Sequence, residues 1–109
     1  MRREIILAPE AKEDFKALKA TDRVAVRDAM EKHLRHEPTK TSRSRIKRLR
    51  GMRRPEYRLR VEGIRVFYDV IAEAVQVLAI VAKSEAAGWL DQHGEPEADA
   101  AEEQGESNR

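Results

Sequence analysis

Three things are scarce in this sequence of 109 residues: cysteine, aromatic residues and long apolar runs. The absence of cysteine excludes a disulfide framework and a thiolate metal site. Aromatic residues make up 5% of the chain and charged residues 39%, which predicts a small core under a highly charged surface. The longest apolar-rich run, residues 75–82, is too short to span a bilayer. Because the apolar run after Met1 is also short and we recognise no signal peptide, we expect a soluble cytoplasmic protein.

Positive charge is abundant, and it is distributed unevenly along the chain. The formal net charge is +2, but residues 91–109 hold seven of the 20 acids and one of the 22 bases. Residues 1–90 therefore carry a charge of +8. Eleven bases and two acids lie in residues 40–65 alone. This concentration of positive charge favours a polyanionic partner, and the alternative is a solvated basic loop.

Residues 57–70, YRLRVEGIRVFYDV, have the pattern of a β-hairpin with a particular charge arrangement. Side chains alternate between faces along a strand, so Arg58 and Arg60 share the face opposite the apolar side chains. A two-residue turn at Glu62–Gly63, with glycine supplying the positive φ, places Arg60 directly opposite Arg65. Like charges at that spacing destabilise a hairpin by up to about 1 kcal/mol. The sequence therefore predicts that an internal carboxylate or an external anion offsets the repulsion.

The rest of the sequence alternates between helical and strand periodicity. Pro9 suits the first turn of a helix, and Thr21 and Ser84 are predicted N-caps of two further helices. Turns or loops are expected at residues 53–55 and at Glu73–Ala74. The expected elements are a strand at 3–7, helices from 9 to 18 and from 22 to about 37, strands at 46–49, 57–61, 64–71 and 75–82, and a helix at 85–90.

These elements predict one α+β domain over residues 1–91. Two N-terminal helices cover one face of a twisted, mainly antiparallel four-stranded sheet, and a short C-terminal helix follows. The other face of the sheet is then free to carry Arg58, Arg60 and Arg65. Residues 92–109 are acidic and poor in apolar side chains, which predicts a disordered tail. That tail either keeps the protein soluble or competes, as a tethered polyanion, for the basic face.

Three segments in this order resemble the RelE/ParE superfamily of bacterial toxins. They are LRG at 49–51, the hairpin at 57–70, and VLAIVAKSEAAGWL at 77–90, and the resemblance covers roughly residues 3–91. It is closest to RelE-like toxins of type II toxin–antitoxin systems. The resemblance implies an endoribonuclease that cleaves mRNA in the ribosomal A site, inhibits translation, needs no cofactor and binds a neutralising antitoxin. The alternatives are a ParE-like toxin that inhibits DNA gyrase and a catalytically weak RNA-binding member of the fold.

The resemblance also implies a catalytic set of Arg58, Arg60, Arg65 and Lys83. The family's alternating basic pair on this strand is usually lysine and is arginine here, and the arginine after the hairpin glycine matches Arg65. Lys83 is closest to the basic residue that follows the last strand. The family's tyrosine in the final helix has no tyrosine counterpart, and Trp89 is nearest. Because arginine stays protonated, the arginines suit phosphate binding, and Lys83 is the best available proton-transfer group.

Other basic and aromatic residues are candidates for RNA binding. Trp89 cannot transfer a proton, but it can stack on a base or pack the final helix onto the sheet. The basic residues around the LRG segment are predicted to attract phosphates non-specifically: Lys47, Arg48, Arg50, Arg53 and Arg54.

Several further residues have a structural interpretation. Asp69 shares the predicted face of the arginines and is the candidate internal carboxylate. Tyr57 and Tyr68 fall on the predicted core side of the hairpin. His33 and His36 lie three residues apart on a helix but have no obvious third ligand, so we expect no metal site and interpret His33, on the apolar stripe, as a packing residue.

Overall fold

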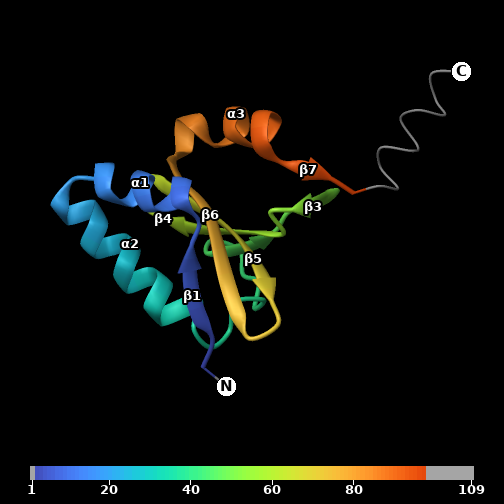
Figure 1. Cartoon of the computed structure of the whole chain (residues 1–109), viewed down its shortest axis with the longest axis horizontal. Helices are drawn as coiled ribbons and strands as arrows, with labels where there is room; N and C mark the ends of the chain where they lie inside the picture. The colour runs from blue at the N-terminus through green and yellow to red at the C-terminus, as the bar shows by residue number, and fades with distance from the viewer. Residues whose placement is uncertain (1, 98–109) are drawn as a thin grey trace, which may run out of the picture.

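The computed structural model describes residues 2–97 and shows a twisted sheet with helices on both faces (Figure 1). Within these residues no helix is long and apolar enough to cross a membrane. The α+β class is confirmed. In chain order the elements are β1 (Glu4–Leu7), α1 (Pro9–Ala17), α2 (Ala20–His33), β2 (Ile46–Arg48), β3 (Met52–Arg54), β4 (Tyr57–Val61), β5 (Ile64–Ile71), β6 (Ala74–Ala82), α3 (Lys83–His93) and β7 (Glu95–Pro96).

The main sheet has five strands in the order β1-β6-β5-β4-β2. Its edge strand β1 runs parallel to β6, while the other neighbours are antiparallel. The expectation of four strands was too low, because the short β2 segment pairs with β4 along its whole length, from Ile46 opposite Leu59 to Arg48 opposite Tyr57. The resulting sheet places the β4–β5 hairpin between the β2 edge and β6.

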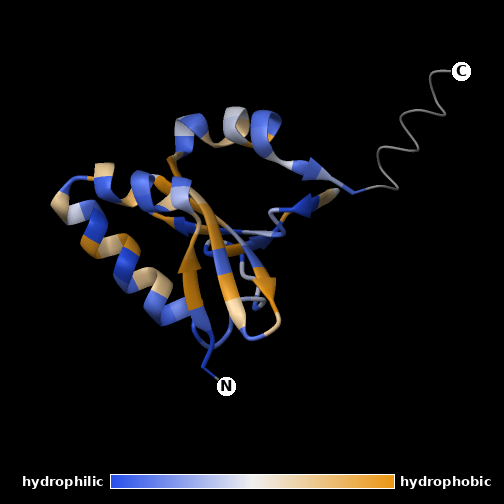
Figure 2. Ribbon diagram, viewed as in Figure 1, coloured by the Kyte–Doolittle hydropathy of each residue, from blue (hydrophilic) through white to orange (hydrophobic). Residues whose placement is uncertain are grey.

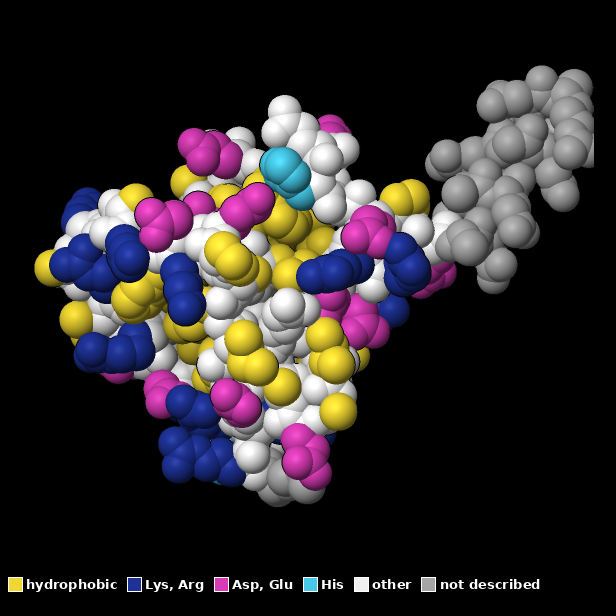
Figure 3. Space-filling view, viewed as in Figure 1, with side chains coloured by type: hydrophobic (Ala, Val, Ile, Leu, Met, Phe, Trp, Pro, Cys, Tyr) yellow, Lys and Arg dark blue, Asp and Glu magenta, His cyan; other side chains and the backbone are white. Residues whose placement is uncertain are grey.

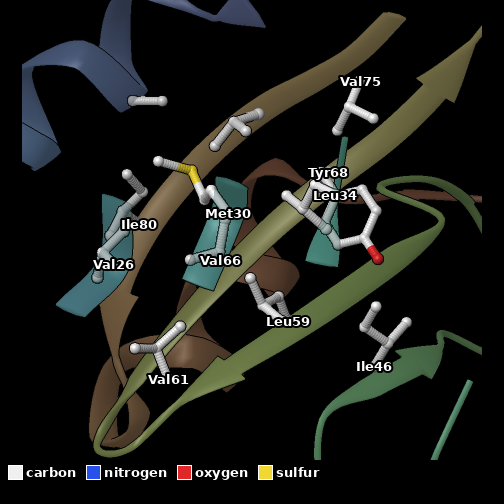
Figure 4. Close-up of a cluster of buried hydrophobic side chains, with 12 residues drawn as sticks. Val26, Met30, Leu34, Ile46, Leu59, Val61, Val66, Tyr68, Val75 and Ile80 are labelled. Atoms are coloured by element: carbon white, nitrogen blue, oxygen red, sulfur yellow. The ribbon is translucent and has the colours of Figure 1, made fainter. Parts of the chain in front are cut away.

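The hydrophobic core lies between α1, α2 and one face of the sheet (Figure 2). Val26, Met30 and Leu34 follow the i, i+4, i+8 spacing of one helix face and point toward the apolar side chains of β4, β5 and β6 (Figure 4). Tyr68 is fully buried there, and its hydroxyl donates a hydrogen bond to the carbonyl oxygen of Pro38 at 2.6 Å. Tyr57 stacks on it at 5.5 Å between ring centroids, so both tyrosines are core residues, as predicted.

The second face of the sheet was predicted to be free. This prediction is wrong for part of the face, because α3 covers it. Phe67 points to this face and is fully buried beneath Trp89, whose ring stacks on it at 5.1 Å with an interplanar angle of 8°. The spacing of Ala86, Trp89 and Leu90 gives α3 one apolar side, and that side is the one turned toward the sheet.

Ordered structure extends past residue 91, where composition had indicated a boundary. α3 continues to His93, and β7 then pairs with β3 in a separate two-stranded sheet. The residues at 53–54, expected in a loop, are thus part of a strand. A strand as short as β7 leaves no periodicity in the sequence. The prediction of disorder from residue 92 therefore rested on acidic composition alone. Residues 98–109, the rest of the predicted tail, lie outside the described residues.

Two predicted helix caps and one predicted turn differ in detail. Lys19 and Ala82 occupy the N-cap positions of α2 and α3 without side-chain cap bonds, so both helices begin two residues before the starts expected from Thr21 and Ser84. The turn between β5 and β6 consists of residues 72–73 and not of Glu73–Ala74, because Ile71 pairs with Ala74.

Candidate functional site

The β4–β5 hairpin has the register that its sequence predicts. Arg60 lies opposite Arg65, and Arg58 lies opposite Phe67. The turn differs in one respect, because Glu62 and not Gly63 adopts the positive φ, at 53°. On the other side of β4, Lys47 is opposite Arg58. Strand pairing therefore gathers four cationic side chains on the face that also carries Phe67.

A cavity of about 280 Å³ lies between part of this face and α3, and three cations line it. Arg58 and Arg65 come from the hairpin, and Lys83 is the first residue of α3, held there by a hydrogen bond from its backbone N–H to the carbonyl oxygen of Gly63 at 2.8 Å. Arg60 is exposed and is not part of the lining. The remaining lining residues are Leu49, Phe67, Ala86, Ala87 and Leu90. The cavity thus combines three cations with an apolar lining that comes from both the sheet side and α3.

The guanidinium groups of the two arginines that line the cavity differ in their hydrogen bonds. Arg65 is only 5% exposed, and its Nη1 donates to the carbonyl oxygens of Glu62 at 2.8 Å and Ile64 at 3.1 Å. Arg58 is half-buried, and its Nε is buried without a hydrogen-bond partner. An unsatisfied buried donor costs free energy, and the side chain that carries it is one of those that line the cavity.

The fold disfavours the charges that it gathers here. Burial lowers the pKa of Arg58, and the charges of Arg65 and Arg60 lower it further. Burial, followed by the charge of Arg60, also lowers the pKa of Arg65. Among residues 2–97, no carboxylate forms an ion pair with these arginines or with Lys83. The positive charge of the cavity is therefore uncompensated within the described part of the chain.

Asp69, the candidate internal carboxylate, serves another part of the structure. It is 6% exposed, accepts a hydrogen bond from the backbone N–H of Glu56 at 2.7 Å, and pairs with Nε of Arg54 at 3.3 Å. Burial raises its pKa, the Glu56 N–H lowers it, and the Glu56 charge raises it. Asp69 therefore fixes the loop before β4 and does not offset the repulsion between Arg60 and Arg65.

Some of the arginines predicted to bind RNA already have partners within the chain. Nη1 of Arg48 donates to the carbonyl oxygens of Leu49, Met52 and Glu56 at 2.9, 3.3 and 3.1 Å, and its guanidinium lies 5.6 Å from the centre of the Tyr57 ring. These bonds shape the loop between β2 and β4. Arg53 pairs with Glu95, and Arg54 pairs with Asp69. Lys47 and Arg50 are exposed and form no ion pair with any other residue in the range 2–97.

Two other candidate residues have mainly structural surroundings. Trp89 lies between Phe67 and His93, whose ring is 5.5 Å away and tilted by 40°, so it packs α3 onto the sheet. A role of Trp89 in base stacking stays a prediction. His33 is half-buried, and burial together with the charges of Arg45 and Lys32 lowers its pKa. No group of three metal-ligating side chains comes together in the described residues.

Sequence reasoning missed the apolar wall of the cavity and the contacts of the C-terminal acids. The spacing of Ala86, Trp89 and Leu90 is the signal that could have identified the wall, because it marks one side of a helix. The pairing of Glu95 with Arg53 has no comparable signal, because the two residues lie 42 positions apart.

Comparison with known proteins identifies the family of this chain. The family described as "ParE toxin of type II toxin–antitoxin system, parDE" matches residues 5–87. No curated protein matches the chain in sequence.

Three solved toxin–antitoxin complexes have a similar fold. The RelB–RelE antitoxin–toxin complex from Methanococcus jannaschii aligns with a TM-score of 0.59 at 16% identity, over 77% of this chain and 96% of that one. The archaeal RelE–RelB complex from Pyrococcus horikoshii gives 0.57 at 19%, over 76% and 97%. The RelBE2 complex from Mycobacterium tuberculosis gives 0.56 at 19%, over 75% and 99%. The chain therefore belongs to the ParE toxin family within the RelE/ParE superfamily, and it is a toxin of a type II toxin–antitoxin system.

Proposed function

We propose that this toxin inhibits translation as an endoribonuclease that cleaves ribosome-bound mRNA, with the scissile phosphate bound in the cavity between the β4–β5 hairpin and α3. The observation that carries the proposal is the uncompensated charge of Arg58, Arg65 and Lys83 around that cavity. A phosphodiester supplies the negative charge that the cavity lacks and oxygen acceptors for further hydrogen bonds from these side chains.

The residues suit RNA cleavage by an internal nucleophile. The 2′-oxygen attacks phosphorus and loses its proton to water, while the bond from phosphorus to the 5′-oxygen breaks. Arg58 and Arg65 stabilise the negative charge that develops on the phosphorane oxygens. The ammonium group of Lys83 donates a proton to the leaving 5′-oxygen. Arg60, at the exposed end of the hairpin, attracts a neighbouring phosphate. In this proposal the arginines supply charge stabilisation and the ribosome supplies the orientation of the RNA strand.

We also propose an antitoxin as the partner that neutralises the toxin. The structurally similar relatives were solved as complexes with RelB antitoxins. An acidic segment that folds on binding would compensate the cationic face without competing for the core. Purification of the toxin together with the product of the adjacent gene tests this partnership, and failure to form a complex at low salt would contradict it.

A second candidate function is inhibition of DNA gyrase. The match to the ParE family favours it, since ParE-like toxins share this fold. Pulse labelling of cells after induction separates the two functions. Translation inhibition predicts that incorporation of amino acids stops before incorporation of thymidine, and gyrase inhibition predicts the reverse order.

A pair of lysine variants tests the site itself. Lys83 and Lys12 are both exposed, but only Lys83 lines the cavity, while Lys12 lies on α1 at the other face of the sheet. Loss of a preorganised contact to the transition state typically costs about 10²–10³-fold in rate. Lys83→Ala should therefore abolish growth arrest, and Lys12→Ala should not. Equal toxicity of the two variants would remove Lys83 from the site.

A further inference from the structure

The C-terminal strap, defined here as residues 94–97, joins the end of α3 to β3 and to Gly51 just before it. Its β7 residues pair with β3, and the backbone N–H of Glu97 donates to the carbonyl oxygen of Gly51 at 2.9 Å. Gly94 makes the close approach possible, because a Cβ at this position would collide with the terminal methyl group of Met52 and lie 2.6 Å from the carbonyl oxygen of Leu90. The strap thus connects the end of α3 to β3 through backbone hydrogen bonds and close packing at Gly94.

Both acids of the strap face arginines that were predicted to attract RNA. Glu95 pairs with Arg53, and Oε1 of Glu97 lies 3.8 Å from Nη2 of Arg48. Basic and acidic side chains accordingly lie side by side where β3 meets β7 (Figure 3). All four side chains are partly solvent-exposed, so each ion pair contributes little stability, and another anion can replace the carboxylate at the arginine.

The strap is connected to the cationic cavity through α3. The apolar side of this helix forms one wall of the cavity, and the strap holds the C-terminal end of the same helix. No residue of α3 is fully buried, so its position depends on its half-buried apolar side with the Trp89 stack, on the strap and on its covalent connection to β6. Release of the strap would therefore leave α3 held at its first residue and by its half-buried apolar side alone.

We propose that the strap is an internal competitor for polyanions. Its carboxylates occupy Arg48 and Arg53 in the free protein, and the phosphates of a bound strand replace them. Displacement of the strap loosens α3 and opens the cavity that contains Arg58 and Arg65. This inference deepens the proposed function and rests on its assignment of RNA as the ligand.

Two double variants with equal loss of negative charge test the competition. Glu95→Gln with Glu97→Gln removes the strap carboxylates. Glu85→Gln with Asp91→Asn removes two exposed acids of α3 that pair with no other residue in the range 2–97. The probe is a fluorescein-labelled 2′-O-methyl RNA oligonucleotide, which cannot be cleaved, and the readout is anisotropy with the full-length chain. The strap variant should bind about two- to tenfold more tightly than the control variant, since two exposed ion pairs no longer compete.

Acrylamide quenching of Trp89, the only tryptophan, reports the position of α3 independently of RNA affinity. Quenching should increase in the strap variant and, on RNA binding, in the wild type. Equal affinity of the two double variants, including no measurable binding by either, overturns the proposal, as does a strap variant with unchanged quenching. If Arg58→Ala leaves RNA affinity unchanged while the strap variant still binds more tightly, the phosphate site of the proposed function fails and the strap stands.

Discussion

Replacement of Arg65 by methionine should make the protein more stable and less toxic at the same time. The guanidinium is 5% exposed, faces Arg60 and has no carboxylate partner among residues 2–97, so the fold carries an uncompensated charge. Its two acceptors are the carbonyl oxygens of exposed Glu62 in the turn and of half-buried Ile64 at the start of β5, and at this end of the hairpin they can be rehydrated. Apolar replacement of buried charges of similar volume is often neutral or stabilising by about 1–4 kcal/mol. We expect a gain of about 1 kcal/mol in the free energy of unfolding, or about 4–8 °C in Tm.

Denaturant unfolding followed by Trp89 fluorescence measures this change, and Arg60→Met is the control. Arg60 is exposed, so its replacement should change stability by no more than about 0.5 kcal/mol. A loss of 1 kcal/mol or more in Arg65→Met would refute the reasoning. It would mean that the bonds of the guanidinium to the two turn carbonyls stabilise the hairpin by more than its burial costs, and loss of toxicity in this variant would then reflect the fold.

Three further predictions concern the scaffold. Tyr68→Phe removes the buried hydrogen bond to the Pro38 carbonyl and should lower the free energy of unfolding by about 1–3 kcal/mol. Growth assays should show that the folded variant is as toxic as the wild type. Ala72 adopts a φ of 51° in the turn after β5, so Ala72→Gly should raise the unfolding free energy by about 0.5 kcal/mol in denaturant titrations. Burial raises the pKa of Asp69 above 3.8, which favours its protonated form in the folded state. The stability of the wild type relative to Asp69→Asn should therefore fall as pH rises from about 3.8 through this raised pKa, and a difference that grows with pH would contradict the assignment.

The hairpin illustrates what the sequence determines. Its alternation has a period of two residues, and the Glu62–Gly63 turn leaves a single register, so the pairing of Arg60 with Arg65 follows from local pattern alone. The positive φ of Glu62 does not follow, because turn type depends on how the flanking strands twist. The register was therefore predictable residue by residue, and the backbone conformation at the turn was not.

The burial of the site could not be predicted in the same way. Alternation assigns Arg65 to a face of the sheet, but whether α3 crosses that face is a tertiary property. The same limit applies to Asp69, whose face was predicted correctly while its partner, Arg54, lies outside the hairpin. The Glu95 contact with Arg53 was hidden in the same way, because composition reports the acidity of a segment and not the arginines that it meets.

Mapping of mRNA 5′ ends by primer extension, in a cell-free translation reaction, tests most directly whether the cavity binds a scissile phosphate. The wild-type toxin should generate new 5′ ends within translated mRNA, and the ends should disappear when ribosomes are omitted. Arg58→Met, which removes one of the three cations that line the cavity, should suppress them by about 10²-fold. Intact mRNA under the wild-type toxin, together with loss of DNA supercoiling by purified gyrase in its presence, would contradict the proposal and assign the toxin to gyrase.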